Sequence, residues 1–145
     1  GIKMIGLRFF TVYGPWGRPD MALFKFTKAI FDGETIDVYN HGNMKRDFTY
    51  ITDIVEGVLI AIDKDYDFEI FNLGNNKPIE LMYFIKCIEK EIGKKANKNM
   101  MHIQDGDVLI TYADISKAKK LLDWEPKIKI EEGIKEFIRW FKEKT

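Results

Sequence analysis

Cysteine and histidine, the residues that most often build disulfides and zinc sites, are scarce in this sequence. There is a single cysteine, Cys87, and two histidines, His41 and His102, that lie far apart. One cysteine cannot form an internal disulfide, which is typical of proteins from a reducing compartment, so we expect a cytoplasmic protein. Neither histidine has the neighbouring ligands that a zinc site needs, and no metal site is expected.

An excess of charge is also missing, because 23 lysines and arginines balance 23 aspartates and glutamates. A neutral chain is not expected to bind nucleic acid or an anionic membrane surface, since both favour basic proteins. No apolar run approaches the roughly 20 residues that cross a bilayer, and no signal peptide is recognised. The 145 residues, 46% of them hydrophobic, are instead typical of one globular domain with a core of its own.

The common motifs of a self-sufficient catalytic centre are absent. No Gly-x-Gly-x-x-Gly dinucleotide fingerprint occurs, since Pro15 and Pro19 interrupt the region around Gly14 and Gly17. None of the six tyrosines has a lysine four residues later, so the chain lacks a Tyr-x-x-x-Lys acid/base pair. A serine nucleophile elbow and a Walker loop are missing as well. The chain taken alone is therefore predicted to hold no catalytic centre.

The apolar pattern predicts short strands that alternate with helices, hence the α/β class. Residues 4–13 form a nearly continuous apolar run, which predicts a strand buried on both faces and suggests the interior of a larger fold. Asp20 is predicted to cap the helix that follows it. A second helix is expected over residues 51–62, a third to begin at Pro78, and the last over residues 130–144.

Arginine is rare among the cations. Of the 23 basic residues 19 are lysines, and the arginines are Arg8, Arg18, Arg46 and Arg139. Because the guanidinium fork fits phosphate and carboxylate better than an ammonium does, an arginine in such a chain is a candidate anion ligand.

Residues 8–22, with the sequence RFFTVYGPWGRPDMA, closely resemble the corresponding segment of UDP-glucuronate 4-epimerases. These enzymes belong to the extended short-chain dehydrogenase/reductase family and serve capsule and cell-wall pathways. Further matching segments follow in the family's order and spacing. They are RDFTYITD at 46–53, FNLG at 71–74, QDGD at 104–107 and YADISK at 112–117.

The resemblance implies that residues 1–145 are the C-terminal substrate-binding domain of such an enzyme. Residues 1–15 would supply the last part of its Rossmann sheet. The N-terminal half, which holds NAD and the Tyr/Lys pair, would be absent from this chain. The full-length protein would be a homodimer that binds a UDP-sugar.

The resemblance also implies roles for individual residues. Thr11 and Arg18 would recognise the hexuronic acid, and Arg46 would bind the diphosphate. Gln104 and Asp107 match positions that contact phosphate and ribose. From the residues alone, Thr11 could equally pack in its strand, Arg18 could be a solvated loop residue, Arg46 could pair with Asp47 or Asp53, and Asp107 could close a turn.

Two further groups complete the site that the resemblance implies. Main-chain groups and apolar walls near Met21, Ala22, Val38 and Tyr39 would hold uracil. The nicotinamide side of NAD would be lined by Phe9 and Phe10.

The reaction so implied converts UDP-glucuronate to UDP-galacturonate by oxidation at C4, rotation of the sugar and reduction on its other face. UDP-glucuronate decarboxylation or sugar-nucleotide dehydration is an alternative within the same enzymes. A non-catalytic UDP-sugar-binding module is an alternative of a different class.

Overall fold

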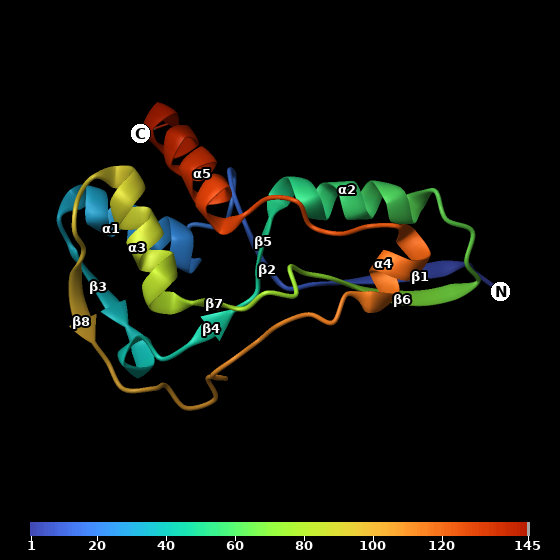
Figure 1. The fold of residues 1–145 in the computed structure, drawn as a ribbon, viewed down its shortest axis with the longest axis horizontal. Coiled ribbons are helices and arrows are strands. Elements are labelled where there is room, and N and C mark those ends of the chain that lie inside the picture. The colour runs from blue at the N-terminus through green and yellow to red at the C-terminus, as the bar shows by residue number, and fades with distance from the viewer. Residues whose placement is uncertain (145) are drawn as a thin grey trace.

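Two parallel strands, β1 (Met4–Phe9) and β6 (Phe68–Leu73), form one end of the molecule in the computed structural model, which describes residues 1–144. Figure 1 shows helix α2 (Ile51–Ile62) running along this pair of strands, with the short helix α4 (Ser116–Leu122) beside β6. These strands and helices share one hydrophobic core and form the first lobe of an elongated molecule. Its buried side chains are Ile54, Ala61, Phe71, Leu73, Ala113, Ile115, Ala118, Leu122 and Trp124.

The prediction of a first strand buried on both faces is wrong for the described chain. Met4 and Phe9 are 53% and 51% exposed, and Phe68 on β6 is 61% exposed. Only Ile5 and Leu7 pack against the core, because the helices cover one face of the two strands. Apolar side chains of α2 are also exposed. These are Val55, Leu59 and Ile62.

The apolar run of residues 4–13 divides at Phe10 into two strands with different partners. The Phe10 amide still donates to the carbonyl of Leu73 at the end of β6. From Thr11 onward the chain forms β2 (Thr11–Tyr13), which runs parallel to β5 (Phe48–Tyr50). Thr11 therefore begins a second strand, at the junction between the two lobes.

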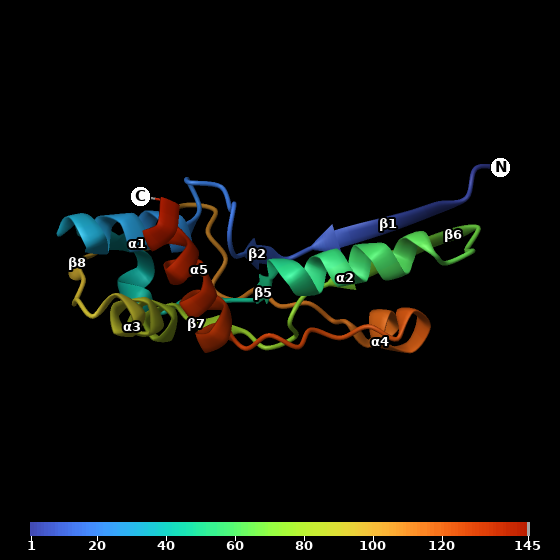
Figure 2. The ribbon, with the colours of Figure 1, turned by 90° about the horizontal axis from the view of Figure 1, so that it is seen from above.

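Three helices build the second lobe, with a short parallel pair of strands on its outer side (Figures 1 and 2). Its core is aromatic; Phe48 stacks on Phe84 with ring centroids 4.2 Å apart. The last helix is confirmed with its predicted bounds, and its inward face is buried as expected. The elements are α1 (Ala22–Asp32), α3 (Leu81–Ile92), α5 (Ile130–Lys144), β3 (Thr35–Val38) and β8 (Asn97–Met100).

Two predicted helix starts are wrong. Asp20 does not cap α1, since the N-cap is Met21 without a side-chain hydrogen bond; the Asp20 carboxylate binds Arg18 instead. Pro78 does not begin a helix, because residues after it pair as β7 (Ile79–Glu80) with β4 (Lys45–Arg46), antiparallel. Asp20 is bound by Arg18, two residues before it, whereas pairing with β4 overrides the helix signal after Pro78.

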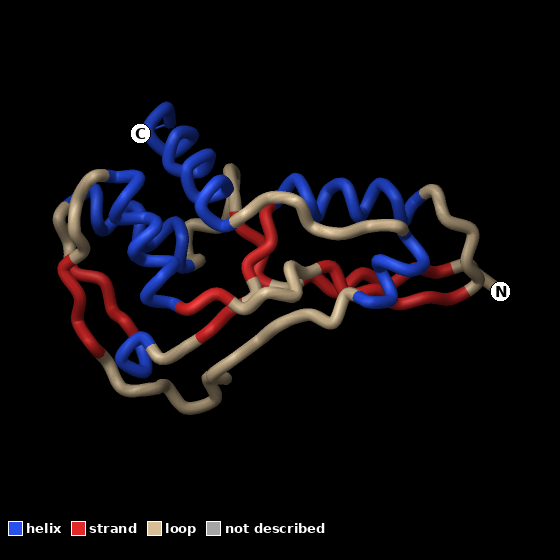
Figure 3. Tube along the Cα trace, in the orientation of Figure 1, coloured by secondary structure: helices blue, strands red, loops and turns tan. Residues whose placement is uncertain are grey.

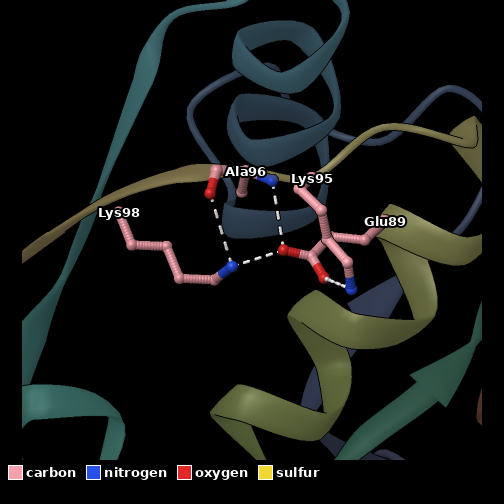
Figure 4. Close-up of polar contacts among 4 residues, drawn as sticks. All are labelled: Glu89, Lys95, Ala96 and Lys98. Carbon is pink, nitrogen blue, oxygen red and sulfur yellow. Dashed lines mark hydrogen bonds and ion pairs between the residues drawn. The ribbon is translucent and has the colours of Figure 1, made fainter.

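Strand β8 is fixed to the end of α3 by one buried carboxylate. Glu89 is 6% exposed and accepts hydrogen bonds from the ammonium groups of Lys95 and Lys98 and from the amide of Ala96 (Figure 4). Burial acts to raise the pKa of Glu89, but these donors outweigh it and lower the pKa to about 2. The carboxylate thus stays ionised and holds the first residues of β8 in place.

A long loop, residues 101–115, connects β8 to α4 and is called the strap below. Figure 3 shows it as an extended tan segment that passes beneath β4. It is anchored at its start by hydrogen bonds from the Met101 amide to Val38 and from the His41 amide to Met101. His41 lies in the 3-10 turn η1 (Tyr39–Gly42), and its ring meets that of His102 edge to face. At its other end Ala113 and Ile115 are buried in the core of the first lobe, so the strap is tied to both lobes.

Candidate functional site

The first and second matching segments meet where β2 and β5 run side by side. The Thr11 amide donates to the carbonyl of Asp47 over 3.1 Å, and Thr11 lies opposite Phe48 in the strand register. Arg46 precedes Asp47, so the pairing brings two predicted ligands, Thr11 and Arg46, to one place. Thr11 stands at the start of β2, where the chain leaves the carboxyl end of β1; ligands of open α/β sheets bind at this edge.

Beside β2 there is a narrow hollow of about 40 Å³. Thr11, Arg18, Met21 and Ala22, all predicted from the sequence as ligand contacts, line it together. The rest of the lining is largely apolar, so a charged group placed here meets one cation and few other polar groups. These remaining residues are Val12, Tyr13, Gly14, Gly17, Leu23, Phe24, Phe48 and Phe137.

A larger hollow of about 360 Å³ lies between α1 and β3 and shares Ala22 with the first. Tyr39 lines it, as do Asp20 and Lys25. Val38 does not, because its side chain is fully buried in a cluster with Ile36 and Ile85. Of the four residues expected around uracil, Ala22 and Tyr39 face this space, Met21 faces the smaller hollow, and Val38 has only main-chain atoms to offer.

The loop that carries Arg18 is held by unusual backbone conformations. Gly14 has φ +138°, and a Cβ there would lie 2.6 Å from a methyl of Ile51, so only glycine fits. Trp16 has φ +62°, a left-handed conformation that is rare for a bulky residue. Trp16 is 77% exposed, and its indole rests edge to face on Trp140 of α5, with ring centroids 5.3 Å apart. The loop is thus held in place by its contact with α5.

Arg18 forms a two-pronged ion pair with Asp20. Its Nε donates to Oδ1 over 3.0 Å and its Nη2 to Oδ2 over 2.5 Å. The carboxylate raises the pKa of Arg18, and in turn the guanidinium lowers the pKa of Asp20. Arg18 is therefore exposed, charged and arranged to bind a carboxylate.

Arg46 is half-buried on β4 and turns toward the strap. Its Nη1 donates to the carbonyl of Lys45 over 3.0 Å and to that of Leu109 over 3.4 Å. Pairing with Asp47 or Asp53 is not observed among the described residues. Because the guanidinium contacts only carbonyl oxygens there, its positive charge is uncompensated and available to an anion.

Sequence reasoning missed the part played by Asp47, which is completely buried. Its two carboxylate oxygens accept hydrogen bonds from the main-chain amides of Asn75, Asn76 and Ala113, at 2.6, 3.0 and 2.7 Å. This one side chain joins the loop after β6 to the end of the strap, directly beside Arg46. Its burial depends on these donors, since a buried carboxylate is costly without hydrogen bonds.

Asp53 is also structural. Its carboxylate accepts from the Ile128 amide over 3.0 Å, and its carbonyl accepts from Nε1 of Trp124 over 2.9 Å. It therefore fixes the segment that leads into α5.

Gln104 and Asp107 lie exposed on the strap. The amide of Asp107 donates to the carbonyl of Gln104 over 3.1 Å, closing a turn in which Gly106 has φ +87°. Within residues 1–144 neither side chain is hydrogen-bonded to the other predicted ligands. The strap reaches Arg46 through Leu109, however, since the Lys45 amide donates to Leu109 and the Thr111 amide to Lys45. Gln104 and Asp107 thus belong to the segment that Arg46 contacts.

Phe9 and Phe10 occupy the carboxyl end of β1. Phe9 is half exposed, whereas Phe10 packs against the core of the first lobe and close to Gly74. Phe9 therefore offers an apolar surface at this edge of the sheet. In the described part of the chain, no group of three or more His, Cys, Asp or Glu side chains is placed to hold a metal ion. None of the helices in residues 1–144 has the length and apolarity that crossing a membrane requires.

The chain is similar to nucleotide-sugar epimerases over nearly its whole length. An uncharacterized protein of Methanocaldococcus jannaschii is 66% identical over 143 residues, covering 99% of this chain and 44% of that protein. A UDP-glucuronate 4-epimerase of Thermodesulfobacterium geofontis is 48% identical over 144 residues, again covering 99% and 44%. The chain thus spans about half the length of the curated relatives it matches.

Solved structures of epimerases are also similar to this chain. The UDP-glucuronic acid 4-epimerase from Bacillus cereus, in complex with UDP-glucuronic acid and NAD, superposes with a TM-score of 0.90 at 34% identity. The match covers 96% of this chain and 45% of the other. The α/β arrangement described above is accordingly one portion of a Rossmann-like epimerase fold. The family model for the NAD dependent epimerase/dehydratase family matches residues 1–74, and the chain belongs to this family.

Proposed function

We propose that the protein containing this chain is an NAD-dependent UDP-glucuronate 4-epimerase and that residues 1–145 form its substrate-binding side. The observation that carries the proposal is the grouping of Thr11, Arg18, Met21 and Ala22 around one hollow, with Arg46 one strand away. The relative from T. geofontis and the solved structure from B. cereus, both named as epimerases of this sugar nucleotide, support it.

The geometry supports a division of labour between two arginines. Arg46, whose described contacts are all carbonyls, would hold the diphosphate, the part of the substrate that stays in place. Arg18 would hold the carboxylate of the sugar with its planar fork. Thr11, between them, can donate its hydroxyl proton to a sugar oxygen. Tyr39 and Ala22, in the adjacent hollow, would flank the base.

NAD, when bound mainly by the other half of the protein, supplies the hydride acceptor for C4 of the sugar. The half-exposed ring of Phe9 fits an apolar wall on this side of the cofactor. This chain's residues would bind and orient the substrate around that step. A clamp at the diphosphate lets the sugar turn about its link to phosphate, so that either face of C4 can be presented. A carboxylate held by Arg18 is also restrained from the geometry that favours loss of CO2.

The exposed apolar surface of the first lobe supports the proposal that more protein covers it. Met4, Phe9 and Phe68 on the strands and Leu59 and Ile62 on α2 are all more than half exposed. In a complete enzyme, the NAD-binding half would pack here. We expect that enzyme to be a cytoplasmic homodimer.

Product analysis of the full-length protein tests the reaction. Supplied with NAD and UDP-glucuronate, it should form UDP-galacturonate, which NMR of the anomeric and C4 protons identifies. Release of CO2 would identify a decarboxylase, and loss of water from the sugar a dehydratase. Binding without any turnover would leave only a UDP-sugar-binding module.

A further inference from the structure

The fork of Arg18 is already occupied by a carboxylate of its own chain. Asp20 accepts from Nε and Nη2 in the side-on, two-bond geometry that an arginine offers to any carboxylate. The uronic acid that Arg18 is proposed to bind carries the same functional group. A sugar acid therefore cannot take the two-bond position on Arg18 until Asp20 leaves it.

The pair is placed so that it can open readily. Its two side chains are 75% and 54% exposed, so water can replace each partner and salt screens their attraction. Asp20 also does not cap α1 as the sequence predicted, since it makes no hydrogen bond to the start of that helix. Besides the Arg18 pair, the Asp20 carboxylate interacts with its own main-chain amide, so few contacts oppose its turning away.

A second position for the Asp20 carboxylate lies close by. Arg18 faces the small hollow next to β2, whereas Asp20 and Lys25 both line the larger hollow between α1 and β3. The positive charge of Lys25 already acts on Asp20 and helps to lower the pKa of its carboxyl group. Asp20 released from Arg18 therefore still has a cation, Lys25, within the larger hollow that both residues line.

We propose that Asp20 is an internal competitor for Arg18 that the carboxylate of a sugar acid displaces, making Asp20 a specificity-determining residue. The inference rests on the proposed function. A uronic acid replaces one charged, two-bond contact with another, at the edge of a largely apolar hollow. An uncharged hexose offers only a hydroxyl, which cannot exchange for the carboxylate, so the Arg18–Asp20 pair stays closed against it.

The test uses the full-length protein loaded with NADH, so that no sugar is oxidised, and calorimetric titration with UDP-glucuronate and UDP-glucose. Asp20→Asn should bind UDP-glucuronate roughly two- to fivefold more tightly, which is the range expected for removing an exposed ion pair. Its affinity for UDP-glucose should equal that of wild type. With Arg18→Ala already present, adding Asp20→Asn should change neither affinity. Asp32→Asn is the matched control, because it opens the exposed Lys28–Asp32 pair at the far end of α1.

Two failures are distinguishable. Suppose that wild-type protein prefers UDP-glucuronate. If Asp20→Asn then weakens UDP-glucuronate binding, Asp20 orients Arg18 and the inference alone is overturned. The inference alone is also overturned if Asp20→Asn changes the affinities for both sugar nucleotides equally, because Asp20 then acts non-specifically. If wild-type protein binds the two sugars equally and Arg18→Ala alters neither affinity, Arg18 does not read a uronic acid. The proposed function then falls, and the inference with it.

Discussion

The main-chain amide of Thr11 and the carbonyl of Asp47 are joined by a 3.1 Å hydrogen bond, which ties the first matching segment to the second. The side chain of the same Asp47 binds three further amides from the loop after β6 and from the strap. One residue thus organises four segments that are distant in the sequence. The candidate site depends on it, although Asp47 has no exposed surface with which to touch a ligand.

Replacing Asp47 by Asn is expected to lower the free energy of unfolding by roughly 2–4 kcal/mol. The amide keeps one acceptor oxygen but presents an NH2 group to main-chain amides that also donate. Urea unfolding measures the loss. Asp63→Asn, at the exposed end of α2, is the control and should unfold like wild type. Equal stability of the two variants would show that relaxation or water satisfies the freed amides.

Arg46→Ala in the full-length protein should weaken UDP-sugar binding by about 1.5–3 kcal/mol, because charged hydrogen bonds to the diphosphate are lost. Isothermal titration with UDP alone isolates this contact from the sugar. Arg139→Ala, which removes an exposed arginine paired with Glu136 on α5, is the control and should bind UDP normally. An unchanged affinity of Arg46→Ala would assign Arg46 to holding Leu109 of the strap.

The sequence predicted the elements of this fold better than their partners. Periodicity located α2 and α5 with their observed bounds, but it predicted the buried face only of α5, since Val55, Leu59 and Ile62 of α2 are exposed. It could not divide residues 4–13, because the change of partner at Phe10 depends on β5 and β6, far along the chain. The polar stretch that forms β8, of sequence NKNM, has little strand preference and is held by pairing with β3 and by Glu89.

In the candidate site, too, local signals were predicted and contacts between segments were not. Thr11, Arg18, Met21 and Ala22 were predicted from one short segment, and a turn in that segment brings them together around one hollow. Asp20 and Asp47 were misjudged or missed, because their roles depend on which groups lie opposite them. A short local signal can name Asp20 as a helix cap, but it does not reveal that Arg18 binds the carboxylate more favourably.

Gly133 on α5 permits the close approach of buried Tyr13. A Cβ at this position would lie 2.1 Å from the Tyr13 hydroxyl, so Gly133→Ala should cost about 1–3 kcal/mol of stability through overpacking. The hydroxyl has no hydrogen-bond partner among the described residues, and burial raises its pKa. Tyr13→Phe should therefore preserve stability or raise it by about 1 kcal/mol.

A double-mutant cycle by thermal or urea unfolding checks this contact. Combined with Tyr13→Phe, Gly133→Ala should cost less than it does alone, because the nearest atom is gone. The rescue should be partial, since two ring carbons would still lie 2.7 Å from the new methyl group. Strictly additive effects would mean that α5 shifts away from Tyr13. Lys135→Ala, on the exposed side of the same helix, is a control for helix propensity.

The 145-residue chain by itself is expected to turn over no UDP-sugar. It contains neither the dinucleotide fingerprint nor a Tyr-x-x-x-Lys pair, so no residue is available to exchange the proton of the C4 hydroxyl. Incubation with NAD and UDP-glucuronate, followed by chromatography of the nucleotide sugars, tests this. The full-length protein is the positive control. Measurable epimerisation by the isolated chain would refute the prediction.

Glu89 should make the protein sensitive to acid. Its pKa is about 2 in the folded protein against an ordinary 4.5, so its contribution of about 1–3 kcal/mol is complete above pH 5. It is lost as the pH falls from about 4.5 to 2, when the carboxylate takes up a proton and releases Lys98, Lys95 and the Ala96 amide. Urea unfolding at pH 7 and pH 3 should therefore show a large stability difference between wild type and Glu89→Gln that shrinks at the lower pH. A difference that is the same at both values would mean that packing, and not the charge of Glu89, holds β8 to α3.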